Sequence, residues 1–379
     1  MGLFFNRENA PFFRKIIRGG GFMSSKRYLV LENGKTFEGV ALGATGESVS
    51  EIVFTTSMTA YLETLTDPSY KGQSVVQTFP LIGNYGIITP DKEGLKPYVS
   101  GYIVRTACDA PSNFRCEEVL DKYLKDNDIQ GIKGIDTRAL TRVLRECGTM
   151  NGMICDDPSH ADLEAIKSYR ITDPVSEVSI KEEKVYEAEG EKVAVVALMD
   201  YGVKYNIIRS LTKRGCEVHL MPSKTTAEKI RELAPDGLFL SNGPGDPEDN
   251  KEQIEVLKQL REDGLPTMGI CLGHQLLALS HGFKTRKLKY GHRGANHPVR
   301  NEETKRIYIS SQNHGYEVVG ESIDENTAKE LFVNVNDGTN EGIRYLNENA
   351  FSVQFHPEAC GGPKDTEFLF DEFMKMMGR

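Results

Sequence analysis

The sequence predicts an α/β protein of two domains: a mixed, β-rich α/β domain followed by a doubly wound domain with a mostly parallel sheet. Three observations support this prediction. The chain has 379 residues, which is long for one ordinary domain. From residue 28 onward, short strand-like runs lie between turn signals. After residue 190, apolar runs alternate with stretches of helical periodicity, as strands and helices do in a parallel sheet.

The first domain is expected to begin with a hairpin, because a strand-like run leads into the turn Asn33-Gly34. Asp136 has the position and residue type of a helix N-cap. The predicted elements are strands at 28–31, 51–54 and 74–79, and helices at 117–126 and 137–146. The stretch KEEKVYEAEG (181–190) is charged and lacks apolar periodicity, so we expect it to link the domains. The first domain would then span 23–180 and the second 191–379.

The second domain opens with a continuous apolar run at 193–199, typical of a parallel strand that is buried on both faces. Predicted helices at 205–214, 226–233, 248–262 and 273–280 alternate with predicted strands at 217–221, 237–240 and 265–270. A more β-rich region follows, with a strand at 351–355 and a closing helix near 366–377. This alternation over short connections predicts the doubly wound sheet.

The composition favours a cytoplasmic protein that binds neither nucleic acid nor membranes. A formal net charge of −9 argues against general nucleic-acid binding, which would favour a basic face. Seven cysteines without C-x-x-C spacing fit free thiols in a reducing compartment. Residues 1–22 lack the apolar stretch and cleavage pattern of a signal peptide. We expect them to be a disordered N-terminal extension, with Met23 as the physiological start.

The sequence GICLG (269–273) has the G-x-nucleophile-x-G form of a nucleophile elbow, with Cys271 in place of serine. It lies where a predicted buried strand turns directly into a predicted helix, the setting that this motif requires. Aligned amide dipoles at a helix N-terminus stabilise the negative charge of a thiolate. Cys271 is therefore the candidate nucleophile.

A thiol nucleophile needs a base, and the base needs a group that orients it. His356 and Glu358 can supply both, because residues two apart in an extended segment point to the same side. The loop SNGPGDP (241–247) follows another predicted strand and should end at the same edge of the sheet. The N–H groups of Gly243 and Leu272 are the candidate oxyanion hole.

Three motifs in this order, NGPGDP (242–247), GICLGHQ (269–275) and VQFHPEA (353–359), resemble those of class I glutamine amidotransferases. Segments 54–86, 134–152, 200–207, 291–299 and 311–318 further resemble the family of carbamoyl-phosphate synthetase small subunits, from about residue 28 to the C-terminus. The resemblance implies hydrolysis of L-glutamine through a cysteine thioester. It also implies transfer of ammonia to a large subunit that makes carbamoyl phosphate for arginine and pyrimidine biosynthesis.

The resemblance also implies a set of glutamine-binding residues. Ser69 would reach the substrate from the first domain, and others would line the scissile amide: Gly243, Gly245, Leu272 and Gln275. The α-amino and α-carboxylate end would be held by Asn313, Gly315 and Tyr316. The last of these stands where the family commonly has phenylalanine, a change that is harmless if the backbone makes the contact.

The chain contains no G-x-x-x-x-G-K-[ST] phosphate loop and no H-E-x-x-H or other metal-ligand spacing. We therefore expect no metal and no cofactor on this chain, with ATP and Mg²⁺ on the large subunit. The expected assembly is a heterodimer of small and large subunits, which could associate further.

Three other interpretations stay open at this stage. The chain could be the glutaminase subunit of another amidotransferase, although those are single domains and the matched region 28–180 argues against them. It could be a free-standing γ-glutamyl hydrolase, which would be fully active without a partner. A non-enzymatic scaffold that only docks and regulates a synthetase would not require Cys271, His356 and Glu358.

Overall fold

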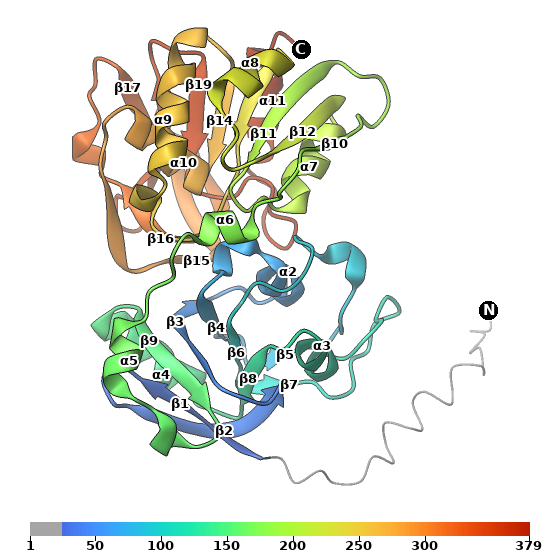
Figure 1. The fold of residues 1–379 in the computed structure, drawn as a ribbon, viewed down its shortest axis with the longest axis vertical. Coiled ribbons are helices and arrows are strands. Elements are labelled where there is room, and N and C mark those ends of the chain that lie inside the picture. The colour runs from blue at the N-terminus through green and yellow to red at the C-terminus, as the bar shows by residue number, and fades with distance from the viewer. Residues whose placement is uncertain (1–24) are drawn as a thin grey trace, which may run out of the picture.

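The computed structural model describes residues 25–379, and the expected N-terminal extension 1–22 lies outside the described residues. Two bodies are stacked along the long axis of the molecule, with helix α6 (Pro174–Val178) close to their boundary (Figure 1). The first body is β-rich, and the second is a large sheet with helices on both faces. The predicted fold class is confirmed.

The first body is built on a closed barrel with the strand order β1-β2-β8-β6-β4-β3-β9. Parallel and antiparallel neighbours are mixed, because β3, β4, β6 and β8 pair in parallel while β1, β2 and β9 pair antiparallel with their neighbours. Its strands are β1 Lys26–Leu31, β2 Thr36–Gly43, β3 Ser48–Thr55, β4 Gln73–Gln77, β6 Gly101–Ile103, β8 Gln130–Lys133 and β9 Met150–Cys155, and a separate pair is formed by β5 Leu81–Ile82 and β7 Thr106–Ala107. Its helices are α2 Tyr61–Thr66, α3 Leu120–Asp126, α4 Thr137–Cys147, α5 Leu163–Ser168 and α6.

The second body is built on a ten-stranded sheet with the order β10-β12-β11-β13-β14-β19-β18-β17-β15-β16. Five neighbouring strands of this order are parallel, as predicted: β12, β11, β13, β14 and β19. The sheet continues with antiparallel pairing through β18, β17, β15 and β16. The strands are β10 Lys184–Tyr186, β11 Ala194–Asp200, β12 Cys216–Pro222, β13 Gly237–Leu240, β14 Thr267–Ile270, β15 Thr285–Asn301, β16 Ile307–Val318, β17 Ala328–Asn334, β18 Asn340–Tyr345 and β19 Ala350–Val353.

Helices cover both faces of this sheet, so the doubly wound prediction holds. One apolar core lies under α7 (Tyr205–Thr212) and α11 (Phe368–Met376) and contains Ile207, Phe370 and Phe373. The other lies under α8 (Ala227–Leu233), α9 (Lys251–Leu260) and α10 (Leu272–Ser280) and contains Ile230, Leu257 and Leu276. The predicted helix at 248–262 is divided into a 3₁₀ turn, Pro247–Asp249, then α9, and then a second 3₁₀ turn, Arg261–Asp263.

The stretch 181–190, which its composition predicted to be a linker, contains a strand. Lys184–Tyr186 forms β10, which pairs antiparallel with β12 at one edge of the second sheet. Edge strands commonly carry charged residues, because charge discourages pairing with other chains. The charged composition of this stretch is therefore also compatible with an edge strand.

The β15–β16 hairpin joins the two bodies. The Thr149 N–H of the first body donates to the Lys289 carbonyl at 2.9 Å, and the Thr56 N–H donates to the Arg293 carbonyl at 3.2 Å. A third bond runs from the Tyr205 N–H to the Glu93 carbonyl at 3.0 Å. These bonds hold the carboxyl edge of the parallel strands against the first body.

Among the described residues, no helix is both long and apolar enough to cross a membrane.

Candidate active site

Cys271 lies between β14 and α10, in the strand-to-helix turn that its motif predicted. Its backbone is strained, with φ 53° and ψ −104°, and such left-handed conformations cost a non-glycine residue roughly 1–3 kcal/mol. The turn is tight because Gly273 packs directly on β13, where an added Cβ would lie 2.3 Å from the Leu240 carbonyl oxygen. The Cys271 Sγ lies 3.6 Å from the Asn313 carbonyl oxygen.

His356 and Glu358 form a buried pair just after β19. The His356 Nδ1 lies 2.7 Å from the Glu358 Oε1, and the other ring nitrogen has no hydrogen-bond partner within residues 25–379. Burial and the charge of Lys204 lower the pKa of His356, but Glu358 and the nearby Cys271 side chain outweigh them and raise it to about 9. Burial works against the ionised form of Glu358, yet His356 and Lys204 hold the pKa of this carboxyl at about 2. The ring is thus fixed through one nitrogen, and the other is free to exchange a proton.

Lys204, at the N-terminus of α7, is a buried cation that the sequence analysis did not single out. Its Nζ lies 3.0 Å from the His356 Nδ1, 3.2 Å from the Glu358 carboxylate and 3.5 Å from the Asp67 carboxylate. Burial lowers the pKa of Lys204, but these two carboxylates raise it above its ordinary value. A protonated Lys204 therefore joins the histidine–glutamate pair to the first domain.

The loop that contains Asp67 and Ser69 brings the first domain into the site. Asp67 accepts the Ser69 N–H at 2.9 Å and the Asn313 side-chain amide at 3.0 Å. The Ser69 hydroxyl accepts a hydrogen bond from the Asn242 side chain at 2.9 Å. Asn242 lies in the 241–247 loop, so Ser69 reaches across to the second domain, and its contact with glutamine stays a prediction.

The 241–247 loop and the elbow are in direct contact. The Gly273 N–H donates to the Ser241 carbonyl at 3.0 Å, and an added Cβ on Gly243 would lie 2.7 Å from a Leu272 methyl carbon. Within residues 25–379, neither the Gly243 N–H nor the Leu272 N–H donates to a backbone acceptor. Both amides are therefore available as oxyanion donors beside Cys271.

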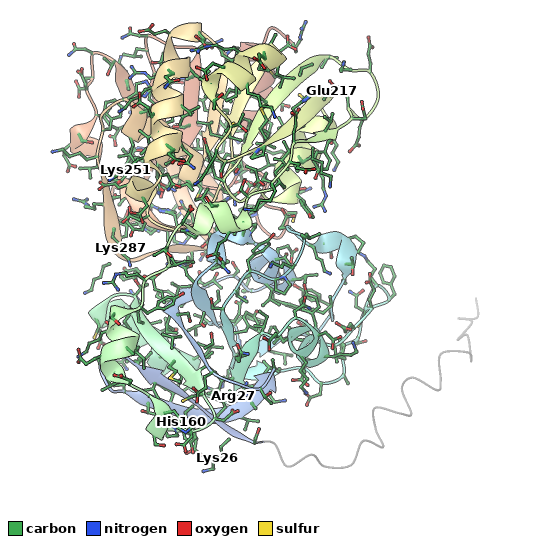
Figure 2. The ribbon with its side chains drawn as sticks, in the orientation of Figure 1. Lys26, Arg27, His160, Glu217, Lys251 and Lys287 are labelled. Atoms are coloured by element: carbon green, nitrogen blue, oxygen red, sulfur yellow. The ribbon has the colours of Figure 1, made fainter. Side chains whose placement is uncertain are left out.

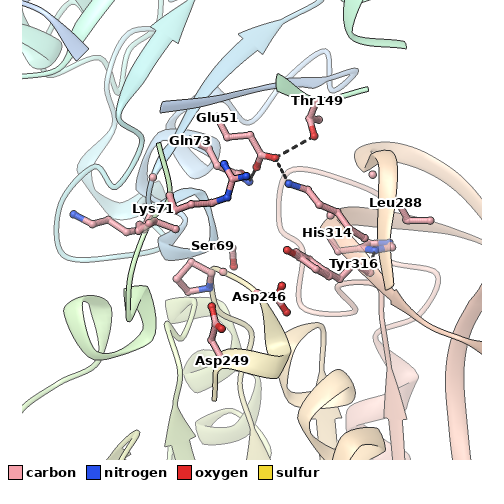
Figure 3. A pocket seen from close by; sticks show the side chains of 18 of the residues that line it. Glu51, Ser69, Lys71, Gln73, Thr149, Asp246, Asp249, Leu288, His314 and Tyr316 are labelled. Carbon is pink, nitrogen blue, oxygen red and sulfur yellow. Dashed lines mark hydrogen bonds and ion pairs between the residues drawn. The ribbon is translucent and has the colours of Figure 1, made fainter. Parts of the chain in front are cut away.

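Cys271, Ser69 and the 241–247 loop meet at a cavity of about 770 Å³ between the two domains, and His356 and Glu358 are not on its wall. Figure 3 shows Ser69 in it beside Tyr316 and Asp246, with Glu51 from β3 at its other side. The predicted site residues on its wall are Ser69, Gly243, Gly245, Cys271, Gln275, Asn313, Gly315 and Tyr316. The Leu272 side chain is instead in the core.

Gln275 is held by two hydrogen bonds from its side-chain amide, to the Tyr316 carbonyl and the Gln354 side chain, each at 2.9 Å. Burial is the main cause that raises the pKa of the Tyr316 phenol above its ordinary value, and a hydrogen bond to Asp246 adds to it.

Three buried side chains near this cavity could hold a metal ion, since His292, His314 and Glu341 offer ligand atoms that lie within 4.8 Å of one another. Each of the four ring nitrogens already has a protein partner: Asp337 and Glu341 for His292, and the Tyr316 carbonyl and Gln312 for His314. These contacts support a structural role for the cluster. The absence of a resident metal stays a prediction.

Comparisons with known proteins agree with this geometry. Residues 197–376 match the family described as "Glutamine amidotransferase class-I", and residues 29–154 match "Carbamoyl-phosphate synthase small chain, CPSase domain". The second domain is thus a class I glutamine amidotransferase domain.

Relatives that match over nearly the whole chain show to which family of glutamine amidotransferases it belongs. The chain is 52% identical over 352 residues to the carbamoyl phosphate synthase small chain of Clostridium perfringens. The matched region covers 92% of this chain and 99% of the relative. It is 49% identical to the protein of that name from Fusobacterium nucleatum, over 92% of this chain and 97% of the relative. The chain belongs to the carbamoyl phosphate synthase small-chain family.

Proposed function

We propose that this chain is the glutaminase subunit of a carbamoyl-phosphate synthetase. The observation that carries the proposal is the position of a strained Cys271 beside the buried His356–Glu358 pair, at a cavity that the first domain closes. Family membership supports the synthetase role, and the first domain argues against a single-domain glutaminase subunit of another amidotransferase.

The proposed reaction begins when His356 takes the proton of the Cys271 thiol and the sulfur attacks the side-chain amide carbon of glutamine. The C=O electron pair moves to oxygen, and the N–H groups of Gly243 and Leu272 stabilise the oxyanion. His356 then gives its proton to the departing nitrogen, so that the C–N bond breaks and ammonia leaves a γ-glutamyl thioester. Water attacks the thioester while His356 takes its proton, which releases glutamate and the cysteine. Glu358 orients the imidazole throughout.

We propose a second cavity, of about 80 Å³, as the exit for the ammonia. His356 lines this cavity but not the first, whereas Cys271 lines the first but not the second. Asn313 lines both. We propose that glutamine enters by the first cavity and that ammonia leaves on the His356 side, toward a large-subunit partner.

The test is the rate of glutamine hydrolysis by the purified chain, measured alone and with a cognate large subunit that is supplied with ATP and bicarbonate. The proposal predicts that the partner stimulates hydrolysis and that carbamoyl phosphate forms in step with glutamate. A chain that is fully active alone and indifferent to the partner would be a free-standing γ-glutamyl hydrolase. A chain that forms no thioester with glutamine even in the complex would be a scaffold.

A further inference from the structure

Arg293 on β15 is a buried cation in the wall of the first cavity, with 5% of its surface exposed. Its guanidinium folds back over two glycines of the hairpin. A Cβ on Gly291 would lie 2.7 Å from the Arg293 Nη1, and a Cβ on Gly315 would lie 3.3 Å from the Nη2. In the β15–β16 register Arg293 is opposite Asn313. The guanidinium thus lies beside the residues expected to hold the amino-acid end of glutamine.

No carboxylate forms an ion pair with Arg293 among the described residues, although the charge of Glu51 favours its protonated form. The Nη1 donates to the Tyr290 carbonyl at 2.8 Å, while the Nε has no partner within residues 25–379. The one acidic residue of β3 is Glu51. Its carboxylate is bound instead by Lys287 at 2.7 Å, Gln73 at 2.8 Å and Thr149 at 3.0 Å.

Arg27, the other deeply buried arginine of the described chain, differs from Arg293 because a carboxylate pairs with it. Arg27 lies 2.8 Å from the Asp156 carboxylate and donates to the carbonyls of Leu42, Ala44 and Gly131. Burial lowers the pKa of Arg293 from its ordinary value, against the opposing effects of Glu51, Tyr70 and Cys271. A buried charge without an ion pair costs several kcal/mol, and an anionic ligand bound here would offset that cost.

We propose that Arg293 binds the α-carboxylate of glutamine and thereby selects a free amino acid over neutral amides. This inference rests on the proposed glutaminase function. The α-carboxylate is the only anionic group of glutamine, and a guanidinium can bind a carboxylate through two parallel hydrogen bonds. A carboxylate held here would place the side-chain amide toward Cys271, which lines the same cavity.

The experiment measures kcat and KM for hydrolysis of L-glutamine and of L-glutaminamide, whose α-carboxylate is replaced by a neutral amide. The enzyme is the complex with the large subunit, in wild-type form and as Arg293→Met and Arg293→Lys. Arg300→Met is the matched control, because Arg300 is on the same strand but half-exposed, pairs with Glu302 at 2.6 Å and is outside the cavity.

Wild type is expected to prefer glutamine, and Arg293→Met should raise the KM for glutamine about 10- to 100-fold, as loss of a hydrogen bond to a charged group does. Its kcat should stay within about threefold, and its KM for L-glutaminamide should change little. Arg293→Lys should recover part of the preference, and Arg300→Met should behave as wild type.

Two results would overturn the role of Arg293. One is a folded Arg293→Met variant that keeps the full preference for glutamine. The other needs no variant: a wild-type enzyme that hydrolyses both substrates with equal kcat/KM. A wild-type complex that hydrolyses neither substrate would instead refute the proposed function on which the inference depends.

Discussion

Replacing Lys204 by methionine tests whether the two domains are joined through the catalytic groups. The change leaves two carboxylates without their shared cation, and both are deeply buried: Asp67 is 4% exposed and Glu358 is 2% exposed. Loss of one partner from a buried ion pair typically costs 3–5 kcal/mol. Here each carboxylate keeps another partner, Asn313 for Asp67 and His356 for Glu358, so we expect about 3 kcal/mol in the free energy of unfolding.

The matched control is Lys192→Met. Lys192 has an exposed side chain and pairs with one carboxylate, Glu217, at 3.1 Å. Figure 2 shows Glu217 on the second domain, well away from Lys287 at the domain boundary. An exposed pair of this kind contributes at most about 1 kcal/mol. The chain has no tryptophan, so urea unfolding should be followed by circular dichroism.

Catalysis should respond as well, because Lys204 anchors the Asp67 loop that contains Ser69. We expect Lys204→Met to raise the KM for glutamine about tenfold, equivalent to roughly 1.4 kcal/mol, while Lys192→Met leaves it unchanged. If Lys204→Met lost no more stability than Lys192→Met and kept the wild-type KM, the buried network would not position the site.

Three further changes test other parts of the site. Ser69→Ala should raise the KM for glutamine with the fold intact, because the hydroxyl lines the cavity, and an unchanged KM would remove Ser69 from the site. Gly243→Ala should reduce kcat by about 10²-fold or more by displacing an oxyanion donor, since the new Cβ would lie 2.3 Å from the Tyr201 carbonyl oxygen; wild-type kcat would exclude that donor. Burial lowers the pKa of His292, but Asp337 and Glu341 raise it to about 9 from an ordinary 6.5, so its stabilisation is complete below pH 6.5 and is lost as the pH rises through 9. His292→Gln should therefore cost more in urea unfolding at pH 7 than at pH 10, and an equal cost at both would contradict the ion pair.

The elbow could be predicted from sequence because its geometry is local. A buried strand, a glycine-flanked cysteine and a helix follow one another within about fifteen residues, and the strained φ of Cys271 follows from that order. The same holds for His356 and Glu358, which are two residues apart in an extended segment.

The barrel of the first domain could not be predicted in this way. It closes through the pairing of β1 with β9, whose residues are over a hundred positions apart, and one of its strands, β6, has three residues. Strand pairs this distant leave no periodic signal in the sequence.

Lys204 and Arg293 were missed for a related reason. Each lies in a segment that resembles the family, DYGVKYNI and GHRGANHPV, but a charged residue in a loop or a hairpin is usually exposed. Their burial depends on the first domain, through Asp67 for Lys204 and through Thr56, which binds the backbone of Arg293. Only the assembled pair of domains makes either residue part of the site.

The most direct test of the glutaminase role is carbamoyl phosphate synthesis by the complex with Cys271→Ser, driven in parallel by glutamine and by added ammonia. The prediction is that glutamine-dependent synthesis falls by more than about 10³-fold while the ammonia-driven rate stays at the wild-type level. Loss of both rates would mean that Cys271 supports the structure and not the chemistry. A wild-type complex that used only ammonia would contradict the proposed function itself.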